Sequence, residues 1–116
     1  MQRFMLKSKI HRAVVTEKQL YYGGSITLDE NLLFAADMLP NEQVQVLNLN
    51  NGSRFLTYTI KAPAGSGTVM LNGPAARIGE IEDIVLVLSY AVYENTEAES
   101  VDPTVVYVDE NNQPKE

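Results

Sequence analysis

Short segments in which apolar and polar residues alternate, separated by turn-forming residues, run through this chain from one end to the other. Because the side chains of a strand point alternately to its two faces, such segments predict β-strands. They lie at residues 10–17, 25–29, 43–49, 54–61, 68–72, 84–93 and 104–109. The longest apolar run, Ile84 to Val92, is expected to form the most buried strand. Closure into a small barrel would remove the exposed edges of so small a sheet.

One segment favours a longer helix. Asp29 can cap a helix over residues 30–39, and Pro40 follows directly after it. The apolar side of this helix would carry Leu32, Leu33, Ala36 and Leu39. The Asn-Gly pair within residues 50–53 is the usual signal of a two-residue hairpin turn, and residues 110–116 are expected to form a frayed tail. We therefore predict a mainly β fold with a few short helices.

The length and the charge limit the classes of function. The 116 residues suit a single domain, residues 1–116, and the net charge of −6 argues against a nucleic-acid partner. The charge is unevenly spread: residues 1–24 hold five basic residues and one acidic residue, a net charge of +4, and the remainder holds four basic and fourteen acidic residues, a net charge of −10. Two interpretations remain open. In one, the acidic residues cluster in a solvated tail; in the other, the N-terminal segment provides a basic pocket for an anionic substrate.

The composition leads us to expect a cytoplasmic protein without a membrane partner. The chain has no cysteine, which suits a reducing compartment. Its first residues lack the apolar centre of a signal peptide, and no apolar run approaches the roughly 20 residues of a membrane span.

Several kinds of site are disfavoured by the residues themselves. His11 is the only histidine, and no carboxylates have the spacing of metal ligands, so we expect no metal. A Ser-His-Asp triad would need His11 and has no supporting motif. The segment GSGT at residues 65–68 resembles part of a phosphate loop but lacks the Lys-Ser/Thr ending.

The segment YYGGSI, residues 21–26, allows two interpretations. The glycines can form an ordinary turn between strands. Alternatively, Gly23 and Gly24 can hold a strained peptide bond, because glycine adopts conformations that other residues avoid. The hydroxyl of Ser25 could then attack the carbonyl that precedes it.

Other segments offer polar groups that could bind an anionic substrate or donate a proton to it. Arg54 and Tyr58 share one face of a predicted strand, whereas Thr57 lies on the opposite face. An arginine can grip a carboxylate and a tyrosine can donate a proton. The turn GPAAR, residues 73–77, offers backbone N–H groups to an anion, although Pro74 removes one of them. In the segment KSKIHR, Lys9 and His11 are two positions apart, so their side chains share a face of the first strand.

Taken in order, these segments resemble the pyruvoyl-dependent aspartate 1-decarboxylase family over nearly the whole chain. The resemblance rests on MLKSKIHRAVVT, YYGGSI, LPNEQVQVLNLNNGSRFLTYTI, GSGTVMLNGPAAR and GEIEDIVLVLSYA. It implies a double-psi β-barrel that assembles as a homotetramer. It also implies self-cleavage between Gly24 and Ser25 into a β chain, residues 1–24, and an α chain, residues 25–116, and for some members an accessory maturation protein.

The implied reaction converts L-aspartate to β-alanine and CO2 for pantothenate biosynthesis, a precursor route to coenzyme A. The cofactor would be a pyruvoyl group made from Ser25, which forms a Schiff base with the substrate, so neither a metal nor pyridoxal phosphate is expected. The resemblance assigns the proton donor to Tyr58, cleavage to Gly24, Ser25 and Thr57, and substrate binding to Lys9, Arg54, Thr57, Gly73, Pro74 and Ala75. His11, Tyr22 and Asn72 would be neighbours in the pocket.

Two alternatives remain beside this hypothesis. The chain could be a non-enzymatic double-psi barrel that serves as a binding module, in which case the glycines form only a turn. It could also be a pyruvoyl-dependent decarboxylase for another acidic amino acid, because Arg54 and Lys9 indicate an acidic substrate without fixing its length.

Overall fold

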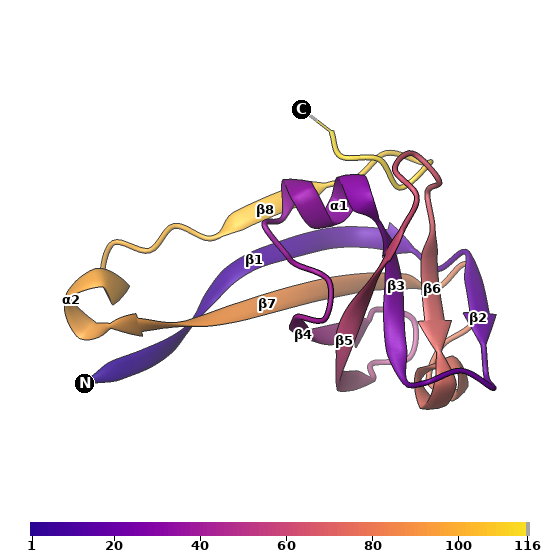
Figure 1. Cartoon of the computed structure of the whole chain (residues 1–116), viewed down its shortest axis with the longest axis horizontal. Helices are drawn as coiled ribbons and strands as arrows, with labels where there is room; N and C mark the ends of the chain where they lie inside the picture. Colours follow the sequence, from indigo (N-terminus) through magenta and orange to yellow (C-terminus); the bar gives the residue numbers. More distant parts are fainter. Residues whose placement is uncertain (116) are drawn as a thin grey trace.

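Eight β-strands and two short α-helices form the structure, a computed structural model that describes residues 1–115 (Figure 1). In chain order the elements are β1 (Gln2–Val14), β2 (Glu17–Gln19), β3 (Ser25–Asp29), α1 (Glu30–Ala35), β4 (Gln43–Asn48), β5 (Arg54–Ala62), β6 (Val69–Asn72), the 3-10 helix η1 (Gly73–Arg77), β7 (Ile84–Glu94), α2 (Asn95–Ala98) and β8 (Thr104–Tyr107). The predicted mainly β fold is confirmed.

The sheet closes into a barrel because the first part of the chain takes part in it twice. β1 pairs with β7, and β2, which follows after Val15 and Thr16, pairs with β6. Between those two partners the order is β6-β3-β5-β4-β7. The consecutive strands β1 and β2 therefore join the two ends of the sheet, and β8 lies outside the ring, parallel to β1. The expected barrel is confirmed.

Two pairs within the ring are parallel, β2 with β6 and β3 with β5. Parallel neighbours cannot be joined by a tight hairpin, so the chain must cross the end of the barrel to make each pair. Two such crossings agree with the double-psi barrel. Side chains from the ring and from α1 fill the interior, among them the fully buried Ile10, Ile26, Leu28, Leu32, Val46, Val69, Val85 and Val87.

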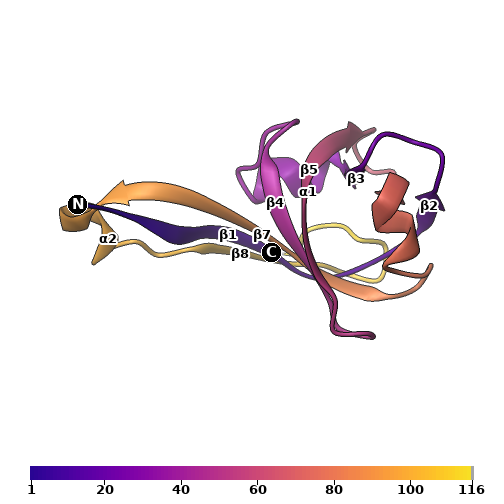
Figure 2. The same ribbon diagram turned by 90° about the horizontal axis from the view of Figure 1, so that it is seen from below.

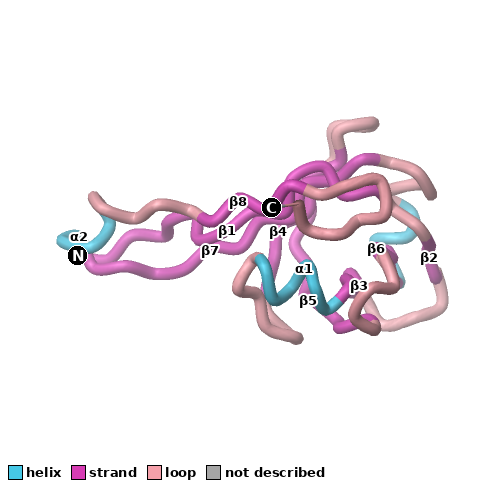
Figure 3. Tube along the Cα trace, turned by 90° about the horizontal axis from the view of Figure 1, so that it is seen from above, coloured by secondary structure: helices cyan, strands magenta, loops and turns pink. Residues whose placement is uncertain are grey.

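The outer halves of β1 and β7 leave the barrel as a two-stranded arm that carries α2 at its tip (Figures 1 and 2). Phe4 pairs with Val92 in this arm, and both side chains are at least half exposed. Seen from the opposite side, the arm is clearly separated from the helix α1 and from the strands β3 and β6 (Figure 3). The arm thus presents apolar side chains that the barrel itself does not cover.

The first helix is shorter than predicted. Its C-cap is Ala36, and Asp37 then adopts a φ of 54°, which ends the helix before residue 39. Leu32 and Leu33 are buried as expected, but Leu39 is outside the helix and 69% exposed. The most buried strand is β3, whose five residues are all buried, rather than the segment at 84–93. The prediction of a two-residue hairpin turn was also wrong in length, because a longer connection, residues 49–53, joins β4 to β5.

The prediction of a frayed C-terminal tail is wrong for residues 110–115; Glu116 lies outside the described residues. Asn112 is 2% exposed and exchanges hydrogen bonds of 2.9 Å with both backbone groups of Val14. Its side-chain nitrogen also donates to the backbone oxygen of Gly67 at 2.9 Å. One amide side chain thus acts as a strand partner for the end of β1 and ties the tail to the barrel.

Candidate active site

Ser25 is the first residue of β3 and is fully buried. In the antiparallel pair of β3 and β6 it stands opposite Asn72, the last residue of β6. Its Oγ donates a hydrogen bond to the backbone oxygen of Gly23 at 3.2 Å and accepts one from Asn72 Nδ2 at 2.9 Å. The backbone is continuous from Gly24 to Ser25, so the geometry is that of an uncleaved chain.

The turn that begins at Gly73 packs directly against the segment before Ser25. Gly73 has a φ of 63°, and a Cβ atom there would lie 2.5 Å from the backbone oxygen of Tyr22 and 2.9 Å from the backbone nitrogen of Gly24. No side chain fits in that space. Pro74 contributes no N–H, but its ring lies against Gly24, where an added Cβ would be 3.4 Å from Pro74 Cδ. The structure therefore brings residues 73–75 to the Gly24–Ser25 peptide.

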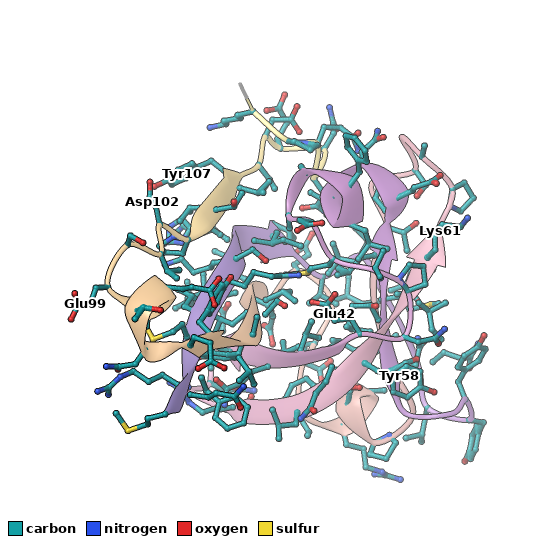
Figure 4. The ribbon with its side chains drawn as sticks, turned by 60° about the vertical axis from the view of Figure 1, so that its left-hand side comes forward. Glu42, Tyr58, Lys61, Glu99, Asp102 and Tyr107 are labelled. Atoms are coloured by element: carbon teal, nitrogen blue, oxygen red, sulfur yellow. The ribbon has the colours of Figure 1, made fainter. Side chains whose placement is uncertain are left out.

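A cavity of about 270 Å³ opens beside this peptide. It is lined by Gly24, Phe55, Leu56, Thr57, Tyr58, Pro74, Ala75 and Ile78. Tyr58 is 39% exposed, and its hydroxyl would lie 3.8 Å from a Cβ placed on Gly23. Figure 4 shows Tyr58 at the side of the barrel, well separated from Tyr107 on β8.

Thr57 and Tyr58 lie on opposite faces of β5 but line the same cavity. The pairing of β5 with β3 includes Thr59 through Ala62, and none of the pairs includes residues 54–58. The cavity occupies this unpaired edge of β5. Side chains from both faces of a strand can reach its edge, so Thr57 and Tyr58 can line one cavity although they lie on opposite faces.

Thr27 is a residue of the site that the sequence reasoning missed. Its Oγ1 accepts a hydrogen bond of 2.8 Å from Asn72 Nδ2, the same nitrogen that donates to Ser25. The sequence does hold a signal for it. Thr27 is two residues beyond Ser25 on one strand, so both side chains lie on the same face.

Arg54 lies in a neighbouring cavity rather than in the one beside Gly24. Its guanidinium donates from Nη1 to Gln45 Oε1 at 2.8 Å. That second cavity, of about 480 Å³, is lined by Phe4, Gln43, Val44, Gln45, Arg54, Leu56 and Tyr90. Leu56 lines both cavities, so they adjoin each other along β5.

Lys9 and His11 lie on β1, away from both cavities. They are half-buried and alternate with the buried Ser8 and Ile10, as expected for residues that share a face. The His11 ring packs edge-on against Tyr107 with centroids 5.4 Å apart. Burial lowers the pKa of His11 below its ordinary value, and the positive charges of Lys9 and Arg12 lower it further. A single chain therefore does not bring Lys9, His11 or Arg54 to Ser25.

The loop that resembles a phosphate loop already holds an anion from its own chain. Asp29 is fully buried, and its carboxylate accepts hydrogen bonds from the backbone amides of Gly65 at 3.1 Å and Gly67 at 2.8 Å. Burial alone would raise the pKa of Asp29, but hydrogen bonds from Gln113 and three backbone amides outweigh this and lower the pKa below its ordinary value. The amides that could bind a phosphate are used to hold β3.

Within residues 1–115, no three His, Cys, Asp or Glu side chains are grouped so that they could hold a metal ion. No helix in this part of the chain has the length and apolar character needed to cross a membrane.

Comparison with known proteins decides the family. The family described as aspartate decarboxylase matches residues 1–115. This chain belongs to the aspartate decarboxylase family. An aspartate 1-decarboxylase from Thermoanaerobacter pseudethanolicus is 58% identical over 114 residues, which cover 98% of this chain and 97% of that protein. The resemblance noted in the sequence is therefore confirmed.

Two further relatives support the assignment to the aspartate decarboxylase family. The aspartate 1-decarboxylase of Pelotomaculum thermopropionicum is 59% identical over 93% of this chain and 82% of its own length. That of Syntrophobacter fumaroxidans is 54% identical over 98% of this chain and 92% of its own length. Coverage this extensive means that the barrel, the arm and the segment around Ser25 all fall within the similarity.

Proposed function

We propose that this chain decarboxylates L-aspartate to β-alanine and CO2 for pantothenate biosynthesis, after cleaving itself between Gly24 and Ser25. The observation that carries the proposal is the buried Ser25 hydroxyl, directly after two glycines and bonded to Asn72, in a member of the aspartate decarboxylase family. An ordinary glycine turn would require neither the burial of this serine nor its contact with a buried amide. The cytoplasmic location expected from the sequence is part of the proposal.

The cleavage would use only atoms of the chain and water. Ser25 Oγ attacks the carbonyl carbon of Gly24, the C–N bond breaks, and the hydroxyl proton passes to the nitrogen, leaving an ester. Loss of the Cα proton of Ser25 then breaks the Cβ–Oγ bond, releasing the Gly24 carboxylate and leaving dehydroalanine. Tautomerisation and addition of one water release ammonia and leave a pyruvoyl group on residues 25–116. Thr57, which lines the cavity beside Gly24, would assist this cleavage.

The pyruvoyl ketone would bind the substrate amine and accept the electrons left at Cα when CO2 departs, a task for which protein side chains are poor. The buried start of β3 suits such a group, because its carbonyl oxygen could take the hydrogen bond that Asn72 gives to Ser25 Oγ. The chemistry requires neither a metal nor pyridoxal phosphate.

Tyr58 would act as the proton donor. Its hydroxyl lies beside Gly23, at the cavity next to the residue that would carry the pyruvoyl group. The half-exposed Tyr22 and the backbone of Gly73 and Ala75 would form the wall of the substrate site, with the Pro74 ring packed on Gly24.

The substrate carboxylates would be held by Arg54 and Lys9, with His11 near them. Since one chain does not bring these residues to Ser25, we propose that the active site lies between subunits of a homotetramer. The exposed apolar side chains beside Arg54, namely Phe4, Leu56 and Tyr90, support an interface at this face. Such an arrangement would combine Arg54 of one subunit with Ser25 of another.

A substrate panel tests this proposal. Purified protein should release β-alanine and CO2 from L-aspartate, and the Ser25→Ala variant should release none. Turnover of L-glutamate in place of L-aspartate would show a decarboxylase for another acidic amino acid. No turnover of any amino acid by fully cleaved protein would contradict an enzymatic role.

A further inference from the structure

Only a few hydrogen bonds fix the orientation of the Asn72 side chain within the described residues. Asn72 is fully buried, and within the described residues its Oδ1 has no hydrogen-bond partner. Its Nδ2 donates to two hydroxyls, Ser25 Oγ at 2.9 Å and Thr27 Oγ1 at 2.8 Å. A rotation of the carboxamide is therefore opposed by these two bonds alone among its polar contacts.

The two hydrogen bonds from Asn72 Nδ2 differ in how firmly their acceptors are held in place. Ser25 Oγ is the atom that must move toward the Gly24 carbonyl during cleavage, so it cannot serve as a fixed reference. Thr27 is 6% exposed and lies in the middle of β3, between pairs with β5 and β6 that include the same residue. The backbone of Thr27 is thus fixed on both sides, and a β-branched side chain has restricted rotation about χ1.

We propose that Thr27 is a positioning residue for self-cleavage: its hydroxyl fixes the carboxamide of Asn72, which in turn holds Ser25 Oγ. The inference rests on the self-cleavage proposed above and adds a residue to it. A serine hydroxyl has one proton and two acceptor positions. With the proton directed to Gly23 and one acceptor position filled by Asn72, the remaining lone pair is free to attack.

Loss of the Thr27 hydroxyl should therefore slow cleavage without unfolding the barrel. In Thr27→Val the size and branching remain, but one N–H of Asn72 loses its acceptor and the carboxamide can turn away from Ser25. Misplacing a reacting group by about 1 Å can cost up to about 10²-fold in rate. We expect cleavage to slow by about tenfold or more, and Thr27→Ser, which keeps a hydroxyl, to restore most of the rate.

Thr59→Val is a matched control. Thr59, like Thr27, is a buried threonine, and its hydroxyl donates to the backbone oxygen of Leu39 at 2.7 Å, so this variant also loses a buried hydrogen bond. It stands beside Ile26 in the pair of β3 and β5 but makes no hydrogen bond to Asn72 or Ser25. A merely structural effect of losing a buried hydroxyl should appear equally in both valine variants.

The experiment follows the loss of intact precursor by mass spectrometry in purified protein, together with the unfolding midpoint of each variant. Slow cleavage in Thr27→Val, with near wild-type rates in Thr27→Ser and Thr59→Val, would support the inference. Equal rates in wild type and Thr27→Val, equal slowing in Thr27→Ser, or equal slowing in Thr59→Val would overturn it. Thr27→Ala provides the same comparison if Thr27→Val does not fold.

The cleavage rates distinguish a failure of this inference from a failure of the proposed function. If the wild type cleaves and Thr27→Val cleaves equally fast, only the role of Thr27 fails. If the purified wild type does not cleave at all, self-cleavage fails and the role of Thr27 fails with it.

Discussion

At the scale of single residues, the site depends on Gly73, a position that has no room for a side chain. Gly73 combines a positive φ with a close approach to residues 22 and 24. The sequence indicated a turn here, but it could not show what the turn would touch, because that contact joins residues about fifty positions apart. The same applies to Thr27, whose proposed role depends on its hydrogen bond with Asn72, the residue of β6 that stands opposite Ser25.

Replacing Gly73 by alanine should slow cleavage strongly and destabilise the chain, because the new Cβ would collide with the backbone of Tyr22 and Gly24. Gly52→Ala is the control: Gly52 has a similar φ of 76°, but a Cβ there meets no atom within 4 Å. The control should show only the cost of the left-handed backbone, about 1–2 kcal/mol. Cleavage followed by intact mass tests the difference, and equal behaviour of the two variants would contradict the role of the close contact.

Tyr58→Phe should cleave normally but decarboxylate aspartate about 10²- to 10⁴-fold more slowly, because positioned proton donors contribute about that much. Tyr93→Phe, on the arm, should keep the wild-type rate. The measurement is β-alanine formation per cleaved chain, so that incomplete maturation does not lower the apparent rate. Wild-type turnover by Tyr58→Phe would remove Tyr58 from its assigned role.

At the scale of elements, β3 is held at both ends. Ser25 at its start contacts Asn72, and Asp29 at its end caps α1 and binds the loop at residues 65–67. The alternating pattern and the capping aspartate predicted the strand and the start of the helix. The pattern could not predict the ordered tail, because the tail depends on distant partners of Asn112, namely Val14 and Gly67. It also missed the end of the helix, which comes where Asp37 adopts a positive φ.

Asp29→Asn should lower the free energy of unfolding by about 2–3 kcal/mol at pH 7, because hydrogen bonds to a charged acceptor are lost. The pKa of Asp29 lies below its ordinary value when folded, so its ionised form stabilises the native state. That stabilisation is present above the unfolded pKa of about 3.9 and is lost as the pH falls through the folded pKa.

The difference in stability between wild type and Asp29→Asn should therefore be constant from pH 7 to about pH 5 and shrink below about pH 4. Denaturant unfolding, in a Ser25→Ala background that keeps the chain intact, measures it. Asp102→Asn, an exposed position, is the control and should change stability little at any pH. A difference that grew as the pH fell would contradict the stabilising role of the Asp29 carboxylate.

At the scale of the whole molecule, the chain consists of a closed barrel and an arm that extends from it (Figure 1). The short strands indicated a closed barrel, since closure is the general way to protect the edges of a small sheet. The arm was not predicted, because residues 2–9 lack the alternation of a half-buried strand. The barrel of this chain leaves the apolar side chains of the arm exposed, and the proposed tetramer would cover them.

Phe4→Ser should weaken the proposed tetramer and lower aspartate turnover, because Phe4 lies in the exposed cavity that also contains Arg54. Phe34→Ser is a matched control, since Phe34 is 88% exposed and Phe4 82%, but Phe34 lies on α1 away from the arm. Native mass spectrometry and a dilution series of activity measure the effect. Loss of the tetramer in both variants, or in neither, would contradict an interface at the arm.

The mass of the purified protein tests most sharply whether the chain makes its own cofactor by breaking the bond before Ser25. We expect two fragments, of 24 and 92 residues, with a ketone in place of the amino group on the larger one. We also expect that Ser25→Ala stays a single chain of 116 residues. A single uncleaved wild-type mass after prolonged incubation, or a larger fragment with a free amino terminus, would contradict the proposed origin of the cofactor.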